Sequence, residues 1–383
     1  MPTISYFLAT TRDPIDDTNP LWNQPLPTSR RGDAITGPVA FEDETLSYGG
    51  YFSAVARFCS ESGWKRVLRA ATDTLAQPLT IANLENVSIF LEKHGAFYHP
   101  ARIAVMVAGQ RLDLVVNVAA SRIGKQALLQ ETRALAALNE HRPFGWYPAV
   151  YAMTDAPLPM FLGNWFDGFH EFHLTRKRGI EELGILVWNG AADPCLLSET
   201  QTEALYRNMA MILAASYDPV TTCQIFPWHH AAGDFVVRLE GDLTSVKLIT
   251  VRNYAPLTEA STELADENEL LEALLIFFLH MGVRMRLDRL DGVSEVVWAP
   301  DNCLGPTIEG FFQGLDLTAR LSGFPEDFPR LFHRYVNHQR AGDLITLAGQ
   351  LVGSIFDHLS EERRVVENHL EAHIHTVVEL LST

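Results

Sequence analysis

Three apolar runs of strand length follow one another in NVSIFLEKHGAFYHPARIAVMVAGQRLDLVVNVAAS, Asn86–Ser121. Turn residues separate the runs at Gly95 and Gly109. The next segment, IGKQALLQETRALAALNEH or Ile123–His141, is rich in Ala, Leu, Gln and Glu, which favour helices. This order predicts an antiparallel meander of three strands followed by a single helix.

Alternating element types continue downstream. Two short apolar runs, Tyr147–Met153 and Pro159–Phe166, predict two more strands. Ser198 and Gln201 have the spacing of a capping box at the start of the helix SETQTEALYRNMAMILAASY. The stretch DFVVRLEGDLTSVKLITVRNY then predicts a hairpin around Gly241.

The two ends of the chain differ from this central part. Residues 1–50 are rich in Pro, Thr, Asp and Gly, which predicts an extended arm pinned by Trp22 and Phe41. Tyr51–Leu79 has helical spacing with a break near Gly63. From Ser261 onward the pattern is almost entirely helical. We therefore expect an N-terminal arm and helical extension (1–80), a small β-rich part (81–166) and a mainly helical part (167–383).

Composition excludes several classes of function. The formal net charge of -17 opposes binding to nucleic acid and to anionic membranes. The most apolar internal run, ALLIFFLHMGV, is too short to span a bilayer. The four cysteines are widely spaced, which predicts reduced thiols, and the N-terminus has no secretory pattern. We expect a cytoplasmic protein with a small-molecule ligand, without a nucleic-acid or membrane partner.

The order of the elements resembles the protein-kinase-like fold, in particular the branch of aminoglycoside phosphotransferases and choline kinases. The resemblance runs from about Asn86 to Tyr254. It implies an α+β fold with two lobes: a small antiparallel β lobe with one helix, and a larger, mainly helical lobe. It also implies ATP and magnesium as cofactors.

The family's small-lobe residues are only partly present. The resemblance places Glu131 at the helix glutamate, but Asn117 stands where the third strand carries a phosphate-binding lysine. Lys93 or Lys125 is a candidate replacement for that lysine. Lys93 lies in EKHGAFYHP, at the phosphate-loop position, where a single glycine is weak evidence for a phosphate cradle.

The catalytic loop is also altered. In PWHHAAGDFVV, Pro227–Val237, the family's catalytic aspartate falls on His229 and its magnesium-binding asparagine on Asp234. A histidine can act as a general base near neutral pH, and a carboxylate can bind magnesium. The second magnesium ligand of the family falls near Thr250, a much poorer ligand. The same loop is also compatible with a buried turn in which Gly233 adopts a positive φ.

Three functional hypotheses follow. The leading one is a kinase-like protein with degenerate motifs that binds a nucleotide-like or other small ligand in a regulatory role. Its ligand-facing residues are Asn117, Glu131, His229 and Asp234, with Lys93 beside the phosphates and Asn164 and Asp167 at the hinge. The second is an active, atypical phosphotransferase acting on a small-molecule hydroxyl, with His229 as base and Asp234 holding magnesium.

The third hypothesis is a metal-dependent hydrolase, since several histidines occur in close pairs. The pairs are His170 with His173, His229 with His230, and His369 with His373. Such a site requires at least three ligands around one ion. The helix that carries the last pair also has an apolar stripe, which suits either a core or pairing with a second copy of the chain.

Overall fold

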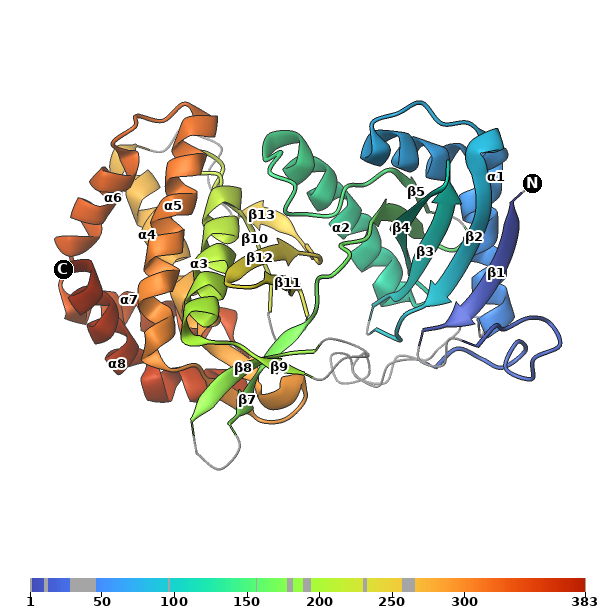
Figure 1. Cartoon of the computed structure of the whole chain (residues 1–383). Coiled ribbons are helices and arrows are strands. Elements are labelled where there is room, and N and C mark those ends of the chain that lie inside the picture. The colour runs from blue at the N-terminus through green and yellow to red at the C-terminus, as the bar shows by residue number, and fades with distance from the viewer. Residues whose placement is uncertain are drawn as a thin grey trace. The chain divides into compact units, whose positions relative to one another are not determined.

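The computed structural model describes residues 2–9, 13–27, 46–95, 97–155, 157–177, 182–188, 194–229, 233–256 and 266–382. The chain divides into two compact units, and Figure 1 labels most of their helices and strands. Unit 1 comprises Met1–Glu140 and Pro148–Asp167, and unit 2 comprises His141–Tyr147 and Gly168–Thr383. Both units contain helices and strands, which confirms the predicted α+β class.

Unit 1 is built around a six-stranded sheet with the order β1-β2-β3-β4-β6-β5. Its strands are β1 (Thr3–Leu8), β2 (Leu84–Leu91), β3 (His99–Val107), β4 (Gln110–Val118), β5 (Ala152–Thr154) and β6 (Met160–Asn164). Neighbours are antiparallel, except that β1 runs parallel to β2. The predicted meander and the helix after it, α2 (Arg122–His141), are confirmed.

One face of this sheet forms the core of unit 1. Buried and half-buried residues alternate along β3, because successive side chains of a strand point to opposite faces. The buried face, which includes Val87, Ile103 and Leu114, packs with the apolar side of α1 (Tyr48–Leu75). Residues Glu61–Trp64 leave the helical conformation, so the predicted break near Gly63 is confirmed.

The N-terminal arm contains a strand that the sequence did not predict. Strand β1 pairs with β2, and Tyr6 contacts the rings of Trp22 and Phe52. The prediction of Trp22 as an anchor is confirmed by these contacts, whereas Phe41 lies outside the described residues. The strand was missed because a six-residue run beside a Pro- and Asp-rich segment has too little periodicity of its own.

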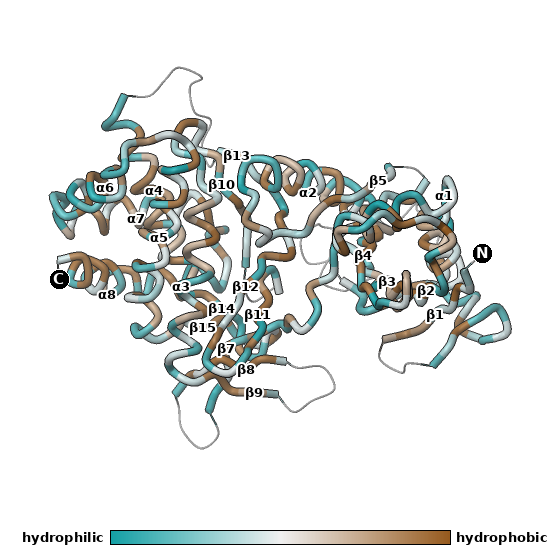
Figure 2. Tube along the Cα trace, turned by 45° about the horizontal axis from the view of Figure 1, so that its top comes forward, coloured by the Kyte–Doolittle hydropathy of each residue, from teal (hydrophilic) through white to brown (hydrophobic). Residues whose placement is uncertain are grey.

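Unit 2 combines six helices with four small sheets in the part of the chain that is described. The helices are α3 (Glu199–Ser216), α4 (Glu267–Met285), α5 (Leu304–Ser322), α6 (Phe328–Asn337), α7 (Ala341–Ile355) and α8 (Glu361–Ser382). The sheets are β7 (Phe172–Arg176) with β8 (Leu183–Val187) and β9 (Cys195–Leu196), β10 (Cys223–Ile225) with β13 (Tyr254–Pro256), β11 (Phe235–Glu240) with β12 (Leu243–Leu248), and β14 (Leu287–Arg289) with β15 (Val296–Trp298). Hydrophobic and hydrophilic segments alternate along the helices, as amphipathic packing requires (Figure 2).

Several predictions for unit 2 are confirmed. Ser198 and Gln201 form the capping box of α3, and β11 and β12 form the hairpin around Gly241. The almost purely helical pattern predicted after Ser261 was wrong for β14 and β15, which have three residues each and are too short for a periodic signal. The four cysteines are free thiols, as predicted.

The apolar stripe of α8 is buried within unit 2. Val366, Leu370, Ile374 and Val377 are all at most 7% exposed. The stripe therefore serves as core, and pairing with a second copy through this helix stays a prediction. Among the described residues, no helix has both the length and the apolar character needed to cross a membrane.

A short segment inside the sequence of unit 1 belongs to unit 2. His141–Tyr147 follows α2, and its backbone accepts hydrogen bonds from the β12 region: the Leu248 amide donates to Trp146 O at 3.0 Å, and Lys247 Nζ donates to Gly145 O at 2.7 Å. The Tyr147 hydroxyl is hydrogen-bonded to the Ser216 hydroxyl at the end of α3. These contacts are internal to unit 2 and account for the assignment of His141–Tyr147 to it.

Helices α3 and α5 approach each other closely through two glycines. A Cβ at Gly310 would overlap the carbonyl oxygen of Arg207, and a Cβ at Gly314 would lie 2.7 Å from the Ala214 Cβ. The spacing of four residues places both glycines on one side of α5. The absence of side chains at these positions lets the two backbones approach.

We expect Gly310→Ala to destabilise the protein by about 1 to 3 kcal/mol, because the new methyl group must separate α3 from α5. The matched control is Gly349→Ala in α7, where an added Cβ meets no atom within 4 Å. That control should instead gain about 0.5 to 1 kcal/mol from helix propensity. Urea unfolding of both variants measures the difference, and equal effects would contradict the close contact.

Candidate functional site

The carboxylate of Asp234 is buried at the start of the β11–β12 hairpin. Asp234 is 1% exposed, and its Oδ2 accepts a hydrogen bond of 2.7 Å from the backbone N–H of His229. The Ile249 amide donates to the Asp234 carbonyl oxygen at 2.7 Å. Gly233 has a φ of +67°, which is the conformation that the buried-turn alternative for this loop requires.

Arg252 binds the same carboxylate with both terminal nitrogens. Its Nη2 lies 2.7 Å from Asp234 Oδ1, and its Nη1 contacts Oδ2. This two-point contact is the strongest geometry available to an arginine and a carboxylate. Arg252 follows β12, so the pair connects the two ends of the hairpin. It lies two residues beyond Thr250, where the sequence comparison placed the second magnesium ligand.

Glu171 is a second carboxylate beside the loop. A Cβ placed at Gly233 would come within 2.9 Å of Glu171 Oε1, so the carboxylate lies directly against this glycine. The neighbouring residue, His170, exchanges backbone hydrogen bonds with Val237 of β11 at 2.8 and 2.9 Å. This bridge positions Glu171 along the hairpin.

The arrangement differs from a divalent cation site. Both oxygens of Asp234 accept hydrogen bonds, from Arg252 and from the His229 amide. A magnesium ion would have to displace the guanidinium from the carboxylate. The magnesium role of Asp234 therefore stays a prediction that requires opening of this pair, and the same holds for the catalytic role of His229 beside it.

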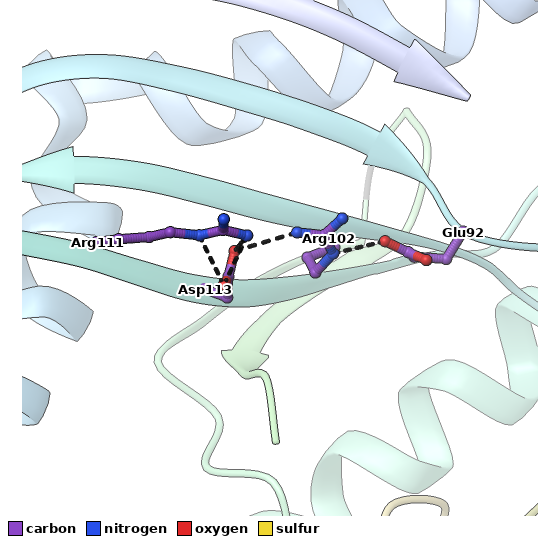
Figure 3. A network of polar contacts seen from close by, with 4 residues as sticks. All are labelled: Glu92, Arg102, Arg111 and Asp113. Carbon is purple, nitrogen blue, oxygen red and sulfur yellow. Dashed lines mark hydrogen bonds and ion pairs between the residues drawn. The ribbon is translucent and has the colours of Figure 1, made fainter. Parts of the chain in front are cut away.

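Among the unit 1 candidates, Asn117 lies on the sheet face opposite α1. It pairs with Pro100 of β3 and Phe161 of β6. Paired residues, and residues two apart in one strand, have side chains on the same face of a sheet, so Asn117 shares its face with Arg102. Figure 3 shows Arg102 between two carboxylates: its Nε donates to Glu92 at 2.6 Å, and its Nη1 donates to Asp113 at 3.3 Å.

This network extends beyond Arg102. Arg111 donates to the same Asp113 carboxylate from its Nε and Nη2 at 3.1 Å (Figure 3). The Arg102 guanidinium also lies 4.2 Å from the centre of the Phe90 ring. The face that carries Asn117 therefore has a paired set of charges, in which two arginines balance two acids.

The remaining candidates in unit 1 are dispersed. Glu131 is a buried residue of α2, at 1% exposure, and Lys93 is exposed after β2. Asn164 Oδ1 accepts the Ala149 amide at 2.7 Å, which gives it a structural role at the end of β6. Asp167 is exposed in the turn that ends unit 1. These residues belong to unit 1, whereas His229 and Asp234 belong to unit 2.

The turn at the predicted phosphate-loop position is closed by its own side chains. His94 Nδ1 and His99 Nδ1 lie 3.2 Å apart, and the Gly95 amide donates to Tyr98 O at 3.0 Å. Burial, followed by the charge of His94, lowers the pKa of His99 to about 4. The low pKa favours the neutral form of His99 in this turn.

The histidine pairs do not form a metal cluster in the described part of the chain. No group of three His, Cys, Asp or Glu side chains is placed there to hold an ion. His173 lies in strand β7, and His170 lies just before this strand. His230 is outside the described residues. On α8, His369 stacks on Trp298 at 5.2 Å between ring centres, and His373 meets the same ring edge-on at 5.7 Å.

The sequence predicted His229 and Asp234 as site residues, and it did not place Arg252 or Glu171 beside them. Arg252 had a weak signal, since it is a lone basic residue directly after a predicted strand beside an acidic loop. Glu171 had none, because its position depends on the bridge between His170 and β11. Comparison of the sequence with models of known protein families and with curated protein sequences gives no match.

We expect Arg252→Ala to cost about 3 kcal/mol of stability, because it leaves a buried carboxylate without its counterion. Asp234→Ala should cost a similar amount, and the double variant should cost less than the sum by about 2 kcal/mol. The control is Arg320→Ala, which removes a surface pair with Asp316. Exposed pairs are worth at most about 1 kcal/mol. Urea unfolding of the two single variants and the double variant measures the three losses of stability. If the loss in the double variant equals the sum of the two single losses, Asp234 and Arg252 are not coupled.

The buried side chain of His373 should lower the free energy of unfolding at acidic pH. Burial, followed by the charge of Arg286, lowers its pKa to about 3, and its Nδ1 has no hydrogen-bond partner. Above the unfolded pKa of 6.5 the histidine is neutral in both states, so it costs nothing there. Below that pH only the unfolded chain takes up the proton, which costs about 1.4 kcal/mol per pH unit.

His373→Leu should therefore reduce the loss of stability between neutral and mildly acidic pH. The control is Ile374→Val, a change in the same helical turn that lowers stability by about 0.5 to 1.5 kcal/mol without altering its pH dependence. Urea unfolding at a series of pH values compares the slopes. A His373→Leu variant with the wild-type slope would show that His373 does not cause the acid loss.

Proposed function

We propose that this chain is a kinase-like protein with a degenerate phosphotransfer site, which binds a small ligand in a binding or regulatory role. The observation that carries the proposal is the Arg252 guanidinium on Asp234. In the family that the sequence resembles, the residue at this position holds magnesium. Here an internal cation takes the carboxylate.

The order of elements within each unit supports the kinase-like interpretation. Unit 1 has three antiparallel strands, the helix α2 with a buried Glu131, and two further strands. Unit 2 has a helix, α3, before the loop at His229, then the β11–β12 hairpin and the helix α4. This is the order in which the family carries its helix glutamate, catalytic loop and metal-binding hairpin.

The charges of unit 1 support the loss of phosphoryl transfer. Asn117, at the lysine position, has no positive charge, and Arg102 on the same face is engaged with Glu92 and Asp113. Phosphoryl transfer depends almost entirely on positioned cations around the phosphates. A face whose arginines are already paired with acids lacks such a cation at the required position.

The proposal predicts that ligand binding does not depend on magnesium. In calorimetric titrations with ATP and other small molecules, replacing magnesium by EDTA should leave any binding unchanged, because Arg252 takes the place of the metal. ADP should not form in the presence of candidate acceptor alcohols. Binding of ATP only with magnesium, together with ADP formation, would instead establish the active phosphotransferase with His229 and Asp234 in catalytic roles.

A further inference from the structure

Arg284 is a buried cation in the last turn of α4. It is 8% exposed, and its guanidinium carbon lies 4.8 Å from the ring centre of Phe226 and 4.7 Å from that of Phe356. Its Nε donates a 2.9 Å hydrogen bond to His280 Nε2. The two rings and the imidazole fix the orientation of the guanidinium, and they leave Nη1 and Nη2 as its remaining donors.

The part of the chain that is described supplies no acceptor for those two nitrogens. No carboxylate there lies within ion-pair distance of Arg284, and its hydrogen bond to His280 uses only Nε. Glu362 acts on Arg284 through its charge but is itself bound by Arg289 at 2.8 Å. Glu362 is therefore near the Arg284 guanidinium but does not form an ion pair with it.

The charge of Arg252 also affects the Arg284 guanidinium. Arg252 Nη1 reaches the carbonyl oxygen of Pro227 at 3.5 Å, directly after Phe226, the residue against which Arg284 packs. Burial is the main cause that lowers the pKa of Arg284 to about 10; the charge of Arg252 lowers it further, and Glu362 opposes this. Asp234 offsets the charge of Arg252, whereas Arg284 has no such contact.

A buried guanidinium without an anionic partner is unfavourable, and native proteins normally pair such a group. The planar edge formed by Nη1 and Nη2 matches the two oxygens of a carboxylate or a phosphate. We propose that Arg284 binds an anionic group, a carboxylate or a phosphate, of the small ligand that unit 2 receives. Ligand identity rests on the proposed function, but the anion site itself stands on the geometry of unit 2.

The test follows thermal unfolding of the full chain during titration with inorganic phosphate and, separately, with acetate at constant ionic strength. Sodium chloride provides the baseline for general salt effects. We expect a saturable rise in the unfolding midpoint above that baseline. A rise with phosphate alone assigns a phosphate subsite, a rise with acetate alone assigns a carboxylate subsite, and no rise with either overturns the proposal.

The variant is Arg284→Met, which keeps the stem of the side chain between the rings but removes the donors. We expect at least tenfold weaker anion binding, while Arg320→Met, at an exposed arginine of α5, should bind like the wild type. Equal binding by Arg284→Met and the wild type would overturn the assignment. If Arg284→Met does not fold, crystals of the wild-type chain soaked with selenate decide: anomalous density must lie within hydrogen-bond distance of Arg284 Nη1 or Nη2, and its absence refutes the site.

Failure of this inference is distinguishable from failure of the proposed function. Magnesium-dependent ATP turnover with no anion effect would refute both statements. Saturable anion binding at Arg284 without any nucleotide binding would leave the anion site intact and assign it to a ligand other than a nucleotide. Magnesium-independent ligand binding without an effect of Arg284→Met would support the degenerate site and refute the anion role.

Discussion

The ion pair between Asp234 and Arg252 is the constraint on which the centre of unit 2 depends. A carboxylate that is 1% exposed cannot keep its charge without compensation, and it obtains that compensation from one guanidinium and one backbone N–H. Because the two residues flank the β11–β12 hairpin, the pair joins the start of β11 to the segment after β12. Loss of Arg252 would remove the ion pair from a buried carboxylate, so Asp234 depends on this arginine.

Much of the fold could be predicted from local patterns. The meander β2–β4, helix α2, the capping box of Ser198 and the β11–β12 hairpin each have a periodic or turn signal within a few residues. Strands β1, β14 and β15 do not: β1 is short and pairs with the distant strand β2, and β14 and β15, which pair with each other, have only three residues each. The residues of the candidate site differ in the same way. His229 and Asp234 are five residues apart in the sequence and could be predicted together. Arg252 and Glu171 lie beside Asp234 and Gly233 only because strands pair, which no local pattern reveals.

Arginine has two different roles in unit 2, although the chain as a whole is strongly acidic, with a net charge of -17. Arg252 neutralises an internal carboxylate, and Arg284 is buried between aromatic rings without one. An acidic surface repels anions over long distances, so selectivity for an anionic ligand would come from short-range geometry at a buried guanidinium rather than from electrostatic steering. Under the proposed function, the site would recognise an anionic ligand with fixed cationic side chains in place of a metal ion.

The segment His141–Tyr147 has a consequence for dividing the protein. It lies between two stretches of unit 1 in the sequence but has its hydrogen-bond partners in unit 2, at Ser216, Lys247 and Leu248. A fragment that stops at Asp167 would contain this segment without those partners and would expose the Tyr147 side chain, which is 1% exposed in the intact chain. A single cut in the chain therefore cannot separate the two units, because it would leave His141–Tyr147 without the partners that bury it.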